Sequence, residues 1–280
     1  MTWTEVSFGV RPSHAETAIG IILRLVPQGL SESGRGRRVL RVYLPRSGHG
    51  RRVFRALARE LRAAGFAPHV ATRPISQAAW QDAWRVHARP VRIGRLAVLP
   101  TWWKAAAGAT AVVVRIDPGM AFGSGEHPTT HLCLAAIERH LTPGATVIDI
   151  GTGSGILAIA AARLGARRVL ALDNDPVAVA VARQNVAANR VTSRVRVIRA
   201  DRLGPAVAPA HLIVANLTAD TLAPFLCDAH RCLRPGGRLV ASGFTAAREA
   251  DVSRAVAAVG LRRVAIMRRR GWSALHAIRD

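Results

Sequence analysis

A glycine-rich turn is the segment of this sequence with the clearest chemical use. Gly151-Thr152-Gly153-Ser154-Gly155 follows an apolar run that ends at Asp149 and precedes a run with helical spacing. Glycines at such a turn let a ligand approach the backbone, and the N–H groups at the helix start can hold an anionic group such as a carboxylate. A dinucleotide site would need glycine at position 156, where this chain has isoleucine. The spacing is therefore G-x-G-x-G, which by itself also fits a tight strand-to-helix connection.

An acidic residue follows the turn at the distance that ribose recognition requires. Asp173 ends the next apolar run, and a carboxylate about 20 positions after such a turn can bind two ribose hydroxyls. The alternative role, a helix N-cap, suits Asp175 better because it directly precedes Pro176. Both motifs lie at the carboxyl ends of adjacent predicted strands, where sheets of this kind bind ligands. Together they predict an adenosyl-ligand site that contains Gly151, Gly153 and Asp173.

Two further polar residues end predicted strands in the same half of the chain. Asp201 is placed to accept a hydrogen bond from an adenine amino group, and it fits an ordinary turn-starting aspartate equally well. Asn216, which precedes Leu217, carries an amide that can orient an amine toward a methyl carbon; an Asx turn or a helix cap is its alternative role. No aromatic residue follows Asn216 to stack a nucleobase, and the only tyrosine is Tyr43. The segment therefore argues against a flipped-base substrate.

The segment 117–130 precedes the turn and is unusually rich in glycine. It is too long for a simple connector, and we expect it to fold over the ligand. Thr129 or Thr130 is expected to cap the following helix and to offer a hydroxyl to the cofactor. His127 and His131 are four residues apart, as in some metal pairs, but a proline stands between them and no further ligands are evident. We expect no metal.

Strands and helices alternate from residue 91 onward. We expect strands at 111–116, 146–149, 168–172, 195–198, 212–215 and 238–242, helices at 129–140, 156–164 and 176–188, and a closing hairpin at 261–267 and 273–278. This alternation predicts an α/β fold with a parallel, doubly wound, Rossmann-like sheet. By analogy, the closing hairpin is typical of the class I methyltransferase variant of that fold.

The first part of the chain has the pattern of a small α+β unit. Strands are expected at 2–10, 39–44 and 66–71, helices at 12–25 and 53–64, and a loop at 29–36. Residues 74–90 have the pattern of a linker helix, with Ser76 as its cap and Trp80 and Trp84 one turn apart. We therefore expect a small domain over 1–73, a linker helix over 74–90 and a doubly wound domain over 91–280.

Composition limits the class of protein. No apolar run approaches the roughly 20 residues of a membrane-spanning helix, and the first residues have no signal-peptide pattern. We expect a soluble, cytoplasmic monomer without membrane contact. The three cysteines, Cys133, Cys227 and Cys232, indicate neither disulfides nor zinc, and the last two are expected to be small buried side chains of one helix.

The net charge of +23 favours acidic partners, nucleic acid above all. Nearly all of the excess is arginine, spread along the whole chain, and Lys104 is the only lysine. This distribution of arginines fits a general compositional bias about as well as it fits a dedicated binding patch. Ribosomal RNA beside a protein substrate is compatible with it.

These motifs resemble those of the PrmA family, the lysine methyltransferases of protein eleven of the large ribosomal subunit. The resemblance covers essentially the whole chain. Its most specific parts are 117–130, the glycine turn at Gly151, Asp173-Asn174-Asp175-Pro176 and Ala215-Asn216-Leu217, and 90–94 resembles the family's entry into its catalytic domain. One departure is Arg268-Arg269-Arg270-Gly271-Trp272, which is basic where the family often has acidic residues.

The resemblance implies S-adenosylmethionine as cofactor, contacted by Thr130, Gly151, Asp173 and Asn216. It also implies that the Phe122 loop lies beside the transferred methyl group and that the small first domain captures a ribosomal protein. The expected reaction is in-line displacement by a neutral amine that Asn216 and the backbone near Leu217 orient, with solvent taking the proton.

Three alternatives remain open: a lysine methyltransferase for another protein, an RNA methyltransferase, and a non-catalytic, ribosome-associated binding module. The positive charge favours RNA, whereas the missing aromatic after Asn216 disfavours it. The intact glycine turn, Asp173 and Asn216 argue against the binding module.

Overall fold

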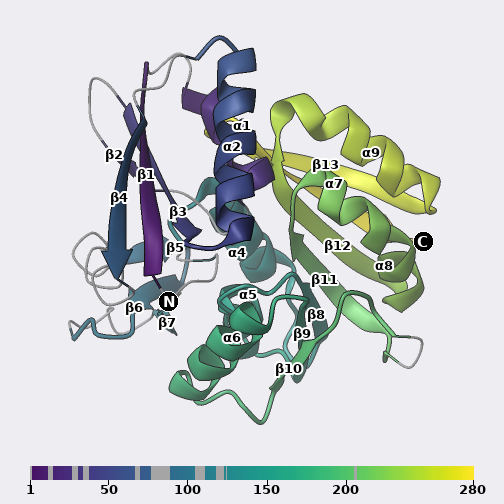
Figure 1. Ribbon diagram of the computed structural model, residues 1–280. Coiled ribbons are helices and arrows are strands. Elements are labelled where there is room, and N and C mark those ends of the chain that lie inside the picture. Colours follow the sequence, from purple (N-terminus) through teal and green to yellow (C-terminus); the bar gives the residue numbers. More distant parts are fainter. Residues whose placement is uncertain are drawn as a thin grey trace. The chain divides into compact units, whose positions relative to one another are not determined.

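The computed structural model (Figure 1) describes residues 2–11, 15–26, 31–33, 38–66, 70–76, 89–104, 111–117, 123, 125–204 and 207–280. The chain divides into two compact units, Met1–Ala88 and Arg89–Asp280. Each unit has its own hydrophobic core.

The first unit is a four-stranded antiparallel sheet with helices on one face (Figure 1). The sheet order is β2 (Ser31–Ser33), β3 (Arg38–Pro45), β1 (Thr2–Val10) and β4 (Val70–Ser76), and the helices are α1 (Ala15–Leu25) and α2 (Gly48–Ala63). Val6, Phe8 and Val10 alternate along β1 and are buried against Ile22 of α1 and Leu57 of α2. The period of two in β1 places these side chains on the face that the helices cover.

Three boundaries in this unit differ from expectation because neighbouring segments decide them. Helix α2 begins at Gly48, five residues before the expected 53, because the Ser47 side chain accepts a hydrogen bond from the Gly50 N–H at 3.2 Å. The expected strand at 66–71 lies instead at Val70–Ser76, in register with β1 from Phe8 to Thr2. β4 therefore runs through the expected domain end at 73, and as an edge strand it tolerates Pro74.

The loop expected at 29–36 contains the short strand β2. The linker helix expected over 74–90 falls mostly on 77–88, which includes Trp80 and Trp84 and lies outside the described residues. Ser76, its expected cap, is the last residue of β4.

The second unit is built on a seven-stranded sheet. Its strands, in sheet order, are β10 (Val195–Arg199), β9 (Arg168–Asp173), β8 (Thr146–Ile150), β11 (Ala210–Asn216), β12 (Leu233–Thr245), β14 (Trp272–Arg279) and β13 (Leu261–Arg269). The first five are parallel, and β14 runs antiparallel to both of its neighbours. The chain moves outward from β8 in one direction and then from β11 in the other, so the ligand-binding switch point lies between β8 and β11.

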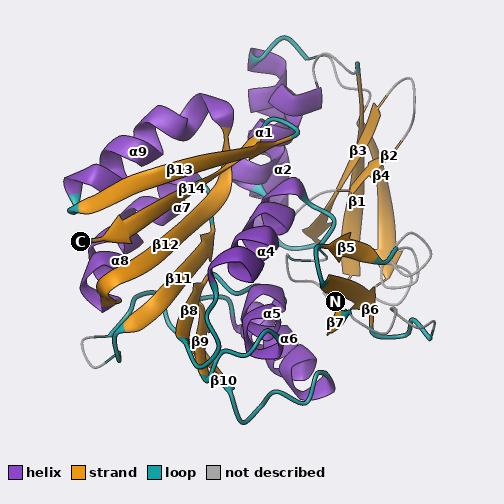
Figure 2. Ribbon diagram, turned by 180° about the vertical axis from the view of Figure 1, so that it is seen from behind, coloured by secondary structure: helices purple, strands orange, loops and turns teal. Residues whose placement is uncertain are grey.

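Helices cover both faces of this sheet, as the doubly wound pattern predicts (Figure 2). On one face lie α4 (Pro128–His140), α5 (Ile156–Arg163) and α6 (Pro176–Ala188); on the other lie α7 (Ala219–Leu222), α8 (Leu226–Cys232) and α9 (Glu249–Ala258), with short 3-10 turns at Ala223–Phe225 and Ala246–Arg248. Val147 and Val214 pack on the face that α4, α5 and α6 cover. Ile148 and Ile213 pack on the face that α7, α8 and α9 cover. A sheet buried on both faces explains why its strands read as nearly continuous apolar runs.

The expected strand at 111–116 does not belong to the doubly wound sheet. It is β7 (Val112–Ile116) of a separate three-stranded sheet with β5 (Val91–Ile93) and β6 (Leu96–Pro100). Asn189, the C-cap of α6, bonds to β7 as a neighbouring strand would: Arg115 N–H donates to its Oδ1 at 2.8 Å and its Nδ2 donates to the Arg115 carbonyl at 2.6 Å. Local periodicity cannot distinguish the two sheets.

Most other expected elements of the second unit agree with the structure to within a few residues. The exception is β12, which extends the expected 238–242 in both directions. Cys133 and Cys232 are buried as small apolar side chains, whereas Cys227, expected to be buried beside Cys232, is exposed. No helix in the described part of the chain combines the length and apolar character needed to cross a membrane.

Candidate active site

The glycine turn joins β8 to α5 at the switch point of the sheet. Gly151, Gly153 and Gly155 have φ values of +69°, +55° and +84°, a left-handed conformation that favours glycine. The N–H groups of Gly151 and Thr152 both donate to the Leu172 carbonyl, at 2.9 and 3.0 Å. The turn is therefore attached to the end of the adjacent strand, β9.

Asp173, at the end of β9, bridges the turn and the start of α6. Its Oδ2 accepts the Gly153 N–H at 2.9 Å, and its Oδ1 accepts the Asp175 N–H at 3.0 Å. Asp175 caps α6 by accepting the Val177 N–H at 2.8 Å, as expected. The Asp173 carboxylate is thus oriented by two backbone donors from the two motifs that the sequence paired.

Asp149 is a fully buried carboxyl beneath the turn. Its Oδ2 accepts the Thr152 hydroxyl at 2.6 Å and the Ala158 N–H at 3.1 Å, while its Oδ1 meets no hydrogen-bond partner among the described residues. Burial raises the pKa of Asp149 to about 7; the two hydrogen bonds oppose this rise, and the nearby charge of Asp173 adds to it. The sequence pattern marks Asp149 only as a strand end, so this role was not predicted.

Thr130 and Asn216, 86 positions apart, come together on the α4 face of the sheet. The Asn216 Nδ2 donates to the Thr130 Oγ1 at 3.3 Å. Thr130 is fully buried in α4, and the Asn216 Oδ1 is buried without a partner among the described residues. A buried acceptor in that state is available to a further hydrogen-bond donor.

The expectation that Thr129 or Thr130 caps α4 is wrong. The N-cap is His127, whose Nδ1 accepts the Thr129 N–H at 3.3 Å and pairs with the Thr129 Oγ1 at 2.7 Å. Pro128 occupies the first turn of the helix, as is common for proline, so the cap falls before it. Burial lowers the pKa of His127 to about 4, and its ring meets that of Trp272 edge-on at 4.7 Å.

Leu217 lies between two glycines, Gly151 of the turn and Gly243 of β12. A Cβ on Gly151 would overlap the Leu217 side chain, and a Cβ on Gly243 would overlap the Leu217 backbone carbonyl. Gly243 has a φ of +101° and lies where the β12–β14 register shifts, and the preceding Ser242 carbonyl accepts the Leu217 N–H at 2.8 Å. Gly243 was not predicted from the sequence; a glycine at the expected end of a strand was the available signal.

Phe122 and Asp201 are the remaining predicted site residues. Phe122 belongs to 118–122, outside the described residues, so the segment 117–130 expected to fold over the ligand is described at Asp117, at Gly123 and over 125–130. Asp201 is exposed in the loop after β10, next to Ala200, whose N–H donates to the Asp173 carbonyl at 2.9 Å.

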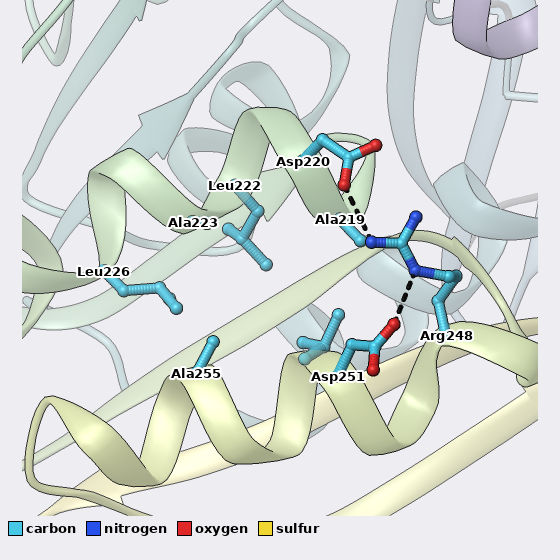
Figure 3. Close-up of a pocket in the computed structure, with 9 residues that line it drawn as sticks. Ala219, Asp220, Leu222, Ala223, Leu226, Arg248, Asp251 and Ala255 are labelled. Carbon is cyan, nitrogen blue, oxygen red and sulfur yellow. Dashed lines mark hydrogen bonds and ion pairs between the residues drawn. The ribbon is translucent and has the colours of Figure 1, made fainter.

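A groove of about 170 Å³ lies between α7, α8 and α9 (Figure 3). Leu222, Leu226 and Val252 line it, and Arg248 spans one end by pairing with Asp220 at 2.7 Å and Asp251 at 2.8 Å. These helices cover the opposite face of the sheet from Thr130 and the Asn216 amide. The groove is therefore separate from the candidate cofactor site.

The site can accept a ligand with a cationic end. Asn216 Oδ1 is a buried acceptor, and Asp149 Oδ1 is one when its carboxyl is ionised. The two lie on neighbouring strands, since Asp149 pairs in register with Val214 and Asn216 is two residues further. Acceptors so placed suit the ammonium and sulfonium groups of S-adenosylmethionine. With the glycine turn, Asp173 and the antiparallel β14 inserted in a doubly wound sheet, they define a class I S-adenosylmethionine-dependent methyltransferase.

Comparison with known proteins specifies the family. The family model described as ribosomal protein L11 methyltransferase (PrmA) matches residues 34–280. The ribosomal protein L11 methyltransferase of Pelotomaculum thermopropionicum is 43% identical over 84% of this chain and 77% of its own length, and that of Chloroflexus aurantiacus is 36% identical over 94% of each. A crystal structure of ribosomal protein L11 methylase from Lactobacillus delbrueckii subsp. bulgaricus superposes with a TM-score of 0.64 at 32% identity, over 69% of this chain and 99% of that one.

The chain belongs to the ribosomal protein L11 methyltransferase family. The resemblance inferred from the motifs, the fold class and the cofactor are thereby confirmed.

Gly243→Ala tests whether close packing around Leu217 supports turnover. Gly236, also in β12, has a φ of +73° and open space where a Cβ would lie, so Gly236→Ala is the matched control. Both variants bear the cost of a left-handed residue, about 1–2 kcal/mol. Only Gly243→Ala displaces Leu217, and we expect its kcat to fall by about tenfold or more. Equal kcat values for the two purified variants would contradict the role assigned to Gly243.

Asp149→Asn tests the protonation of the buried carboxyl. In the folded chain Asp149 holds its proton to about pH 7, whereas its ordinary pKa is 3.8. Stability is therefore fully present below pH 3.8, falls as the pH rises through this window and levels off above about 7. The decline is on the order of 4 kcal/mol, at about 1.4 kcal/mol per tenfold change in proton affinity.

The asparagine variant lacks this decline, so its stability relative to the unsubstituted protein should rise between about pH 4.5 and 7.5. Urea unfolding at a series of pH values measures the difference. Parallel stability curves for the two proteins would show that Asp149 ionises normally in the fold.

Proposed function

We propose that this chain transfers methyl groups from S-adenosylmethionine to lysine amino groups of ribosomal protein L11. The names of its relatives support the substrate. The observation that carries the chemistry is the buried Oδ1 of Asn216, which lacks a partner among the described residues and lies at the end of β11, beside Thr130 and the glycine turn. An amide acceptor there can hold an amine N–H and direct the nitrogen lone pair.

The cofactor contacts are proposed residue by residue. The turn at Gly151 and Gly153 would hold the methionine carboxylate at the start of α5, where backbone N–H groups favour an anion. Asp173 would bind the ribose hydroxyls: each carboxylate oxygen has two lone pairs, and each accepts one backbone N–H at present. Asp201 would accept the adenine amino group, and Thr130 would contact the cofactor through its hydroxyl.

The amine must be neutral to attack. When bound, S-adenosylmethionine supplies a methyl group activated by its positive sulfur. Asn216 Oδ1 and the Leu217 backbone would orient the amine in line with that methyl group, and the ordered approach lowers the activation barrier. Burial lowers the pKa of His127 to about 4, and the same effect would disfavour the protonated form of the substrate lysine at the carboxyl ends of these strands. Solvent would take the proton before the amine enters.

The unit Met1–Ala88 is proposed to bind the ribosomal protein. We propose that the chain acts as a cytoplasmic monomer and works close to ribosomal RNA. The net charge of +23 supports the last point, because arginine-rich surfaces are attracted to phosphate backbones.

Incubation with radiolabelled S-adenosylmethionine, purified ribosomal protein L11, other ribosomal proteins and naked ribosomal RNA tests the substrate. We expect label on lysines of ribosomal protein L11. Label on RNA alone would support the RNA methyltransferase alternative and overturn the proposal. Label on another protein would overturn the substrate, and label on none of them would favour the binding module.

Two substitutions separate cofactor binding from turnover. Asp173→Ala removes the carboxylate that orients the turn, and we expect no cofactor binding by calorimetry. Asn216→Ala removes the amine acceptor, and we expect measurable binding with kcat reduced by about tenfold or more. Asp280→Ala, at an exposed carboxylate paired with Arg262, is the control and should leave both unchanged. Unchanged cofactor affinity in Asp173→Ala would refute the ribose assignment.

A further inference from the structure

A buried amide in α6 connects two parts of the site. Asn185 is 2% exposed, and its side chain makes three hydrogen bonds. The Nδ2 donates to the Asp117 carbonyl at 2.8 Å and to the Ser154 carbonyl at 2.9 Å, and the Oδ1 accepts the Asp117 N–H at 3.0 Å. Both donor hydrogens and the acceptor are therefore used, between the end of β7 and the glycine turn.

Ser154 makes the second connection from within the turn. Its buried Oγ donates to the Gly123 carbonyl at 2.7 Å. Gly123 has a φ of +112°, and a Cβ there would lie 2.5 Å from the Ser154 Oγ and 3.2 Å from Ile156 Cγ2. The chain at Gly123 therefore lies directly against the turn and the start of α5.

The two connections converge on one residue. Segment 117–123 begins at Asp117 and ends at Gly123, and both ends reach Ser154, the first through the Asn185 amide and the second through the Ser154 hydroxyl. Helix α6 is also capped by Asp175, whose N–H donates to the Asp173 carboxylate. One helix therefore carries contacts to the turn, to the start of the segment and to the proposed ribose-binding carboxylate.

We propose that Asn185 and Ser154 are positioning residues for methyl transfer, which hold Asp117 and Gly123 against the cofactor turn. The hydrogen bonds are buried, so displacement of Asp117 or Gly123 would leave polar groups unpaired and out of reach of water. The role depends on the proposed methyl transfer at this turn and not on the identity of the acceptor protein.

Asn189 provides a matched control one helical turn further on. It is also buried, and its amide bonds to Arg115 of β7 and to the Asn185 carbonyl. It makes the same kind of bonds as Asn185 but none to Ser154. A merely structural role in attaching β7 to α6 would therefore be shared by both asparagines, whereas positioning of the turn belongs to Asn185.

Steady-state methyl transfer and calorimetry on the full chain test the proposal. For Asn185→Ala we expect kcat to fall about tenfold to 100-fold, the range for a misplaced reacting group. The Kd for S-adenosylmethionine should change by less than about threefold, a difference worth less than ~0.7 kcal/mol. Asn189→Ala should keep kcat within about threefold. Equal kcat values for the two variants, or a Kd change as large as the kcat change, would overturn the proposal.

Ser154→Ala removes a single oxygen and guards against a folding defect in Asn185→Ala. Ser154→Ala should lower kcat, as Asn185→Ala does, while its unfolding midpoint stays near that of the unsubstituted chain. A folded Ser154→Ala variant with unchanged kcat would remove Ser154 from the proposal.

Hydrogen exchange supplies a measurement that does not require the protein substrate that accepts the methyl group. In the unsubstituted chain, S-adenosylmethionine should slow exchange in peptides covering 150–157 and also in those covering 111–117, which include the Asp117 N–H that donates to Asn185. In Asn185→Ala the first effect should remain and the second should disappear. Persistence of both effects would refute the coupling, whereas coupled exchange without label on ribosomal protein L11 would refute the substrate alone.

Discussion

The close approach of the glycine turn to its surroundings is the constraint on which the site depends. Without a Cβ at Gly151, the turn can lie against Leu217, and Leu217 in turn fits against Gly243. The backbone groups of the turn are bonded to the end of β9 and to Asp173. The carboxyl ends of neighbouring strands are thereby held together, and a side chain at Gly151 or Gly243 would separate them.

Burial determines the electrostatics at the carboxyl ends of these strands. Asp149 retains its proton to about pH 7 and the pKa of His127 falls to about 4, because a charge on either group is poorly solvated. Two buried oxygens, on Asp149 and Asn216, have no partner among the described residues. The unpartnered oxygens can stabilise the cationic groups of the cofactor, and burial favours the neutral form of an attacking amine.

Much of the fold was predictable because the elements of the doubly wound sheet are long and strongly periodic. The glycine turn and Asp173 were predictable because their roles depend on spacing within one strand-helix-strand unit. The errors arose where a distant segment or a neighbouring residue decides the local structure. Pairing with β1 moved β4, Pro128 moved the cap of α4 to His127, and pairing with β6 placed β7 in a separate sheet.

The sequence by itself determined the class of protein, because the alternation of elements, the G-x-G-x-G turn and Asp173 are all local patterns. Only the tertiary structure decided which distant residues complete the site. Thr130 meets Asn216 across 86 positions, Gly243 lies against Leu217, and Asn185 joins Asp117 to Ser154. Such contacts depend on the register of strands and the packing of helices, since residues far apart in the chain satisfy one another's buried polar groups.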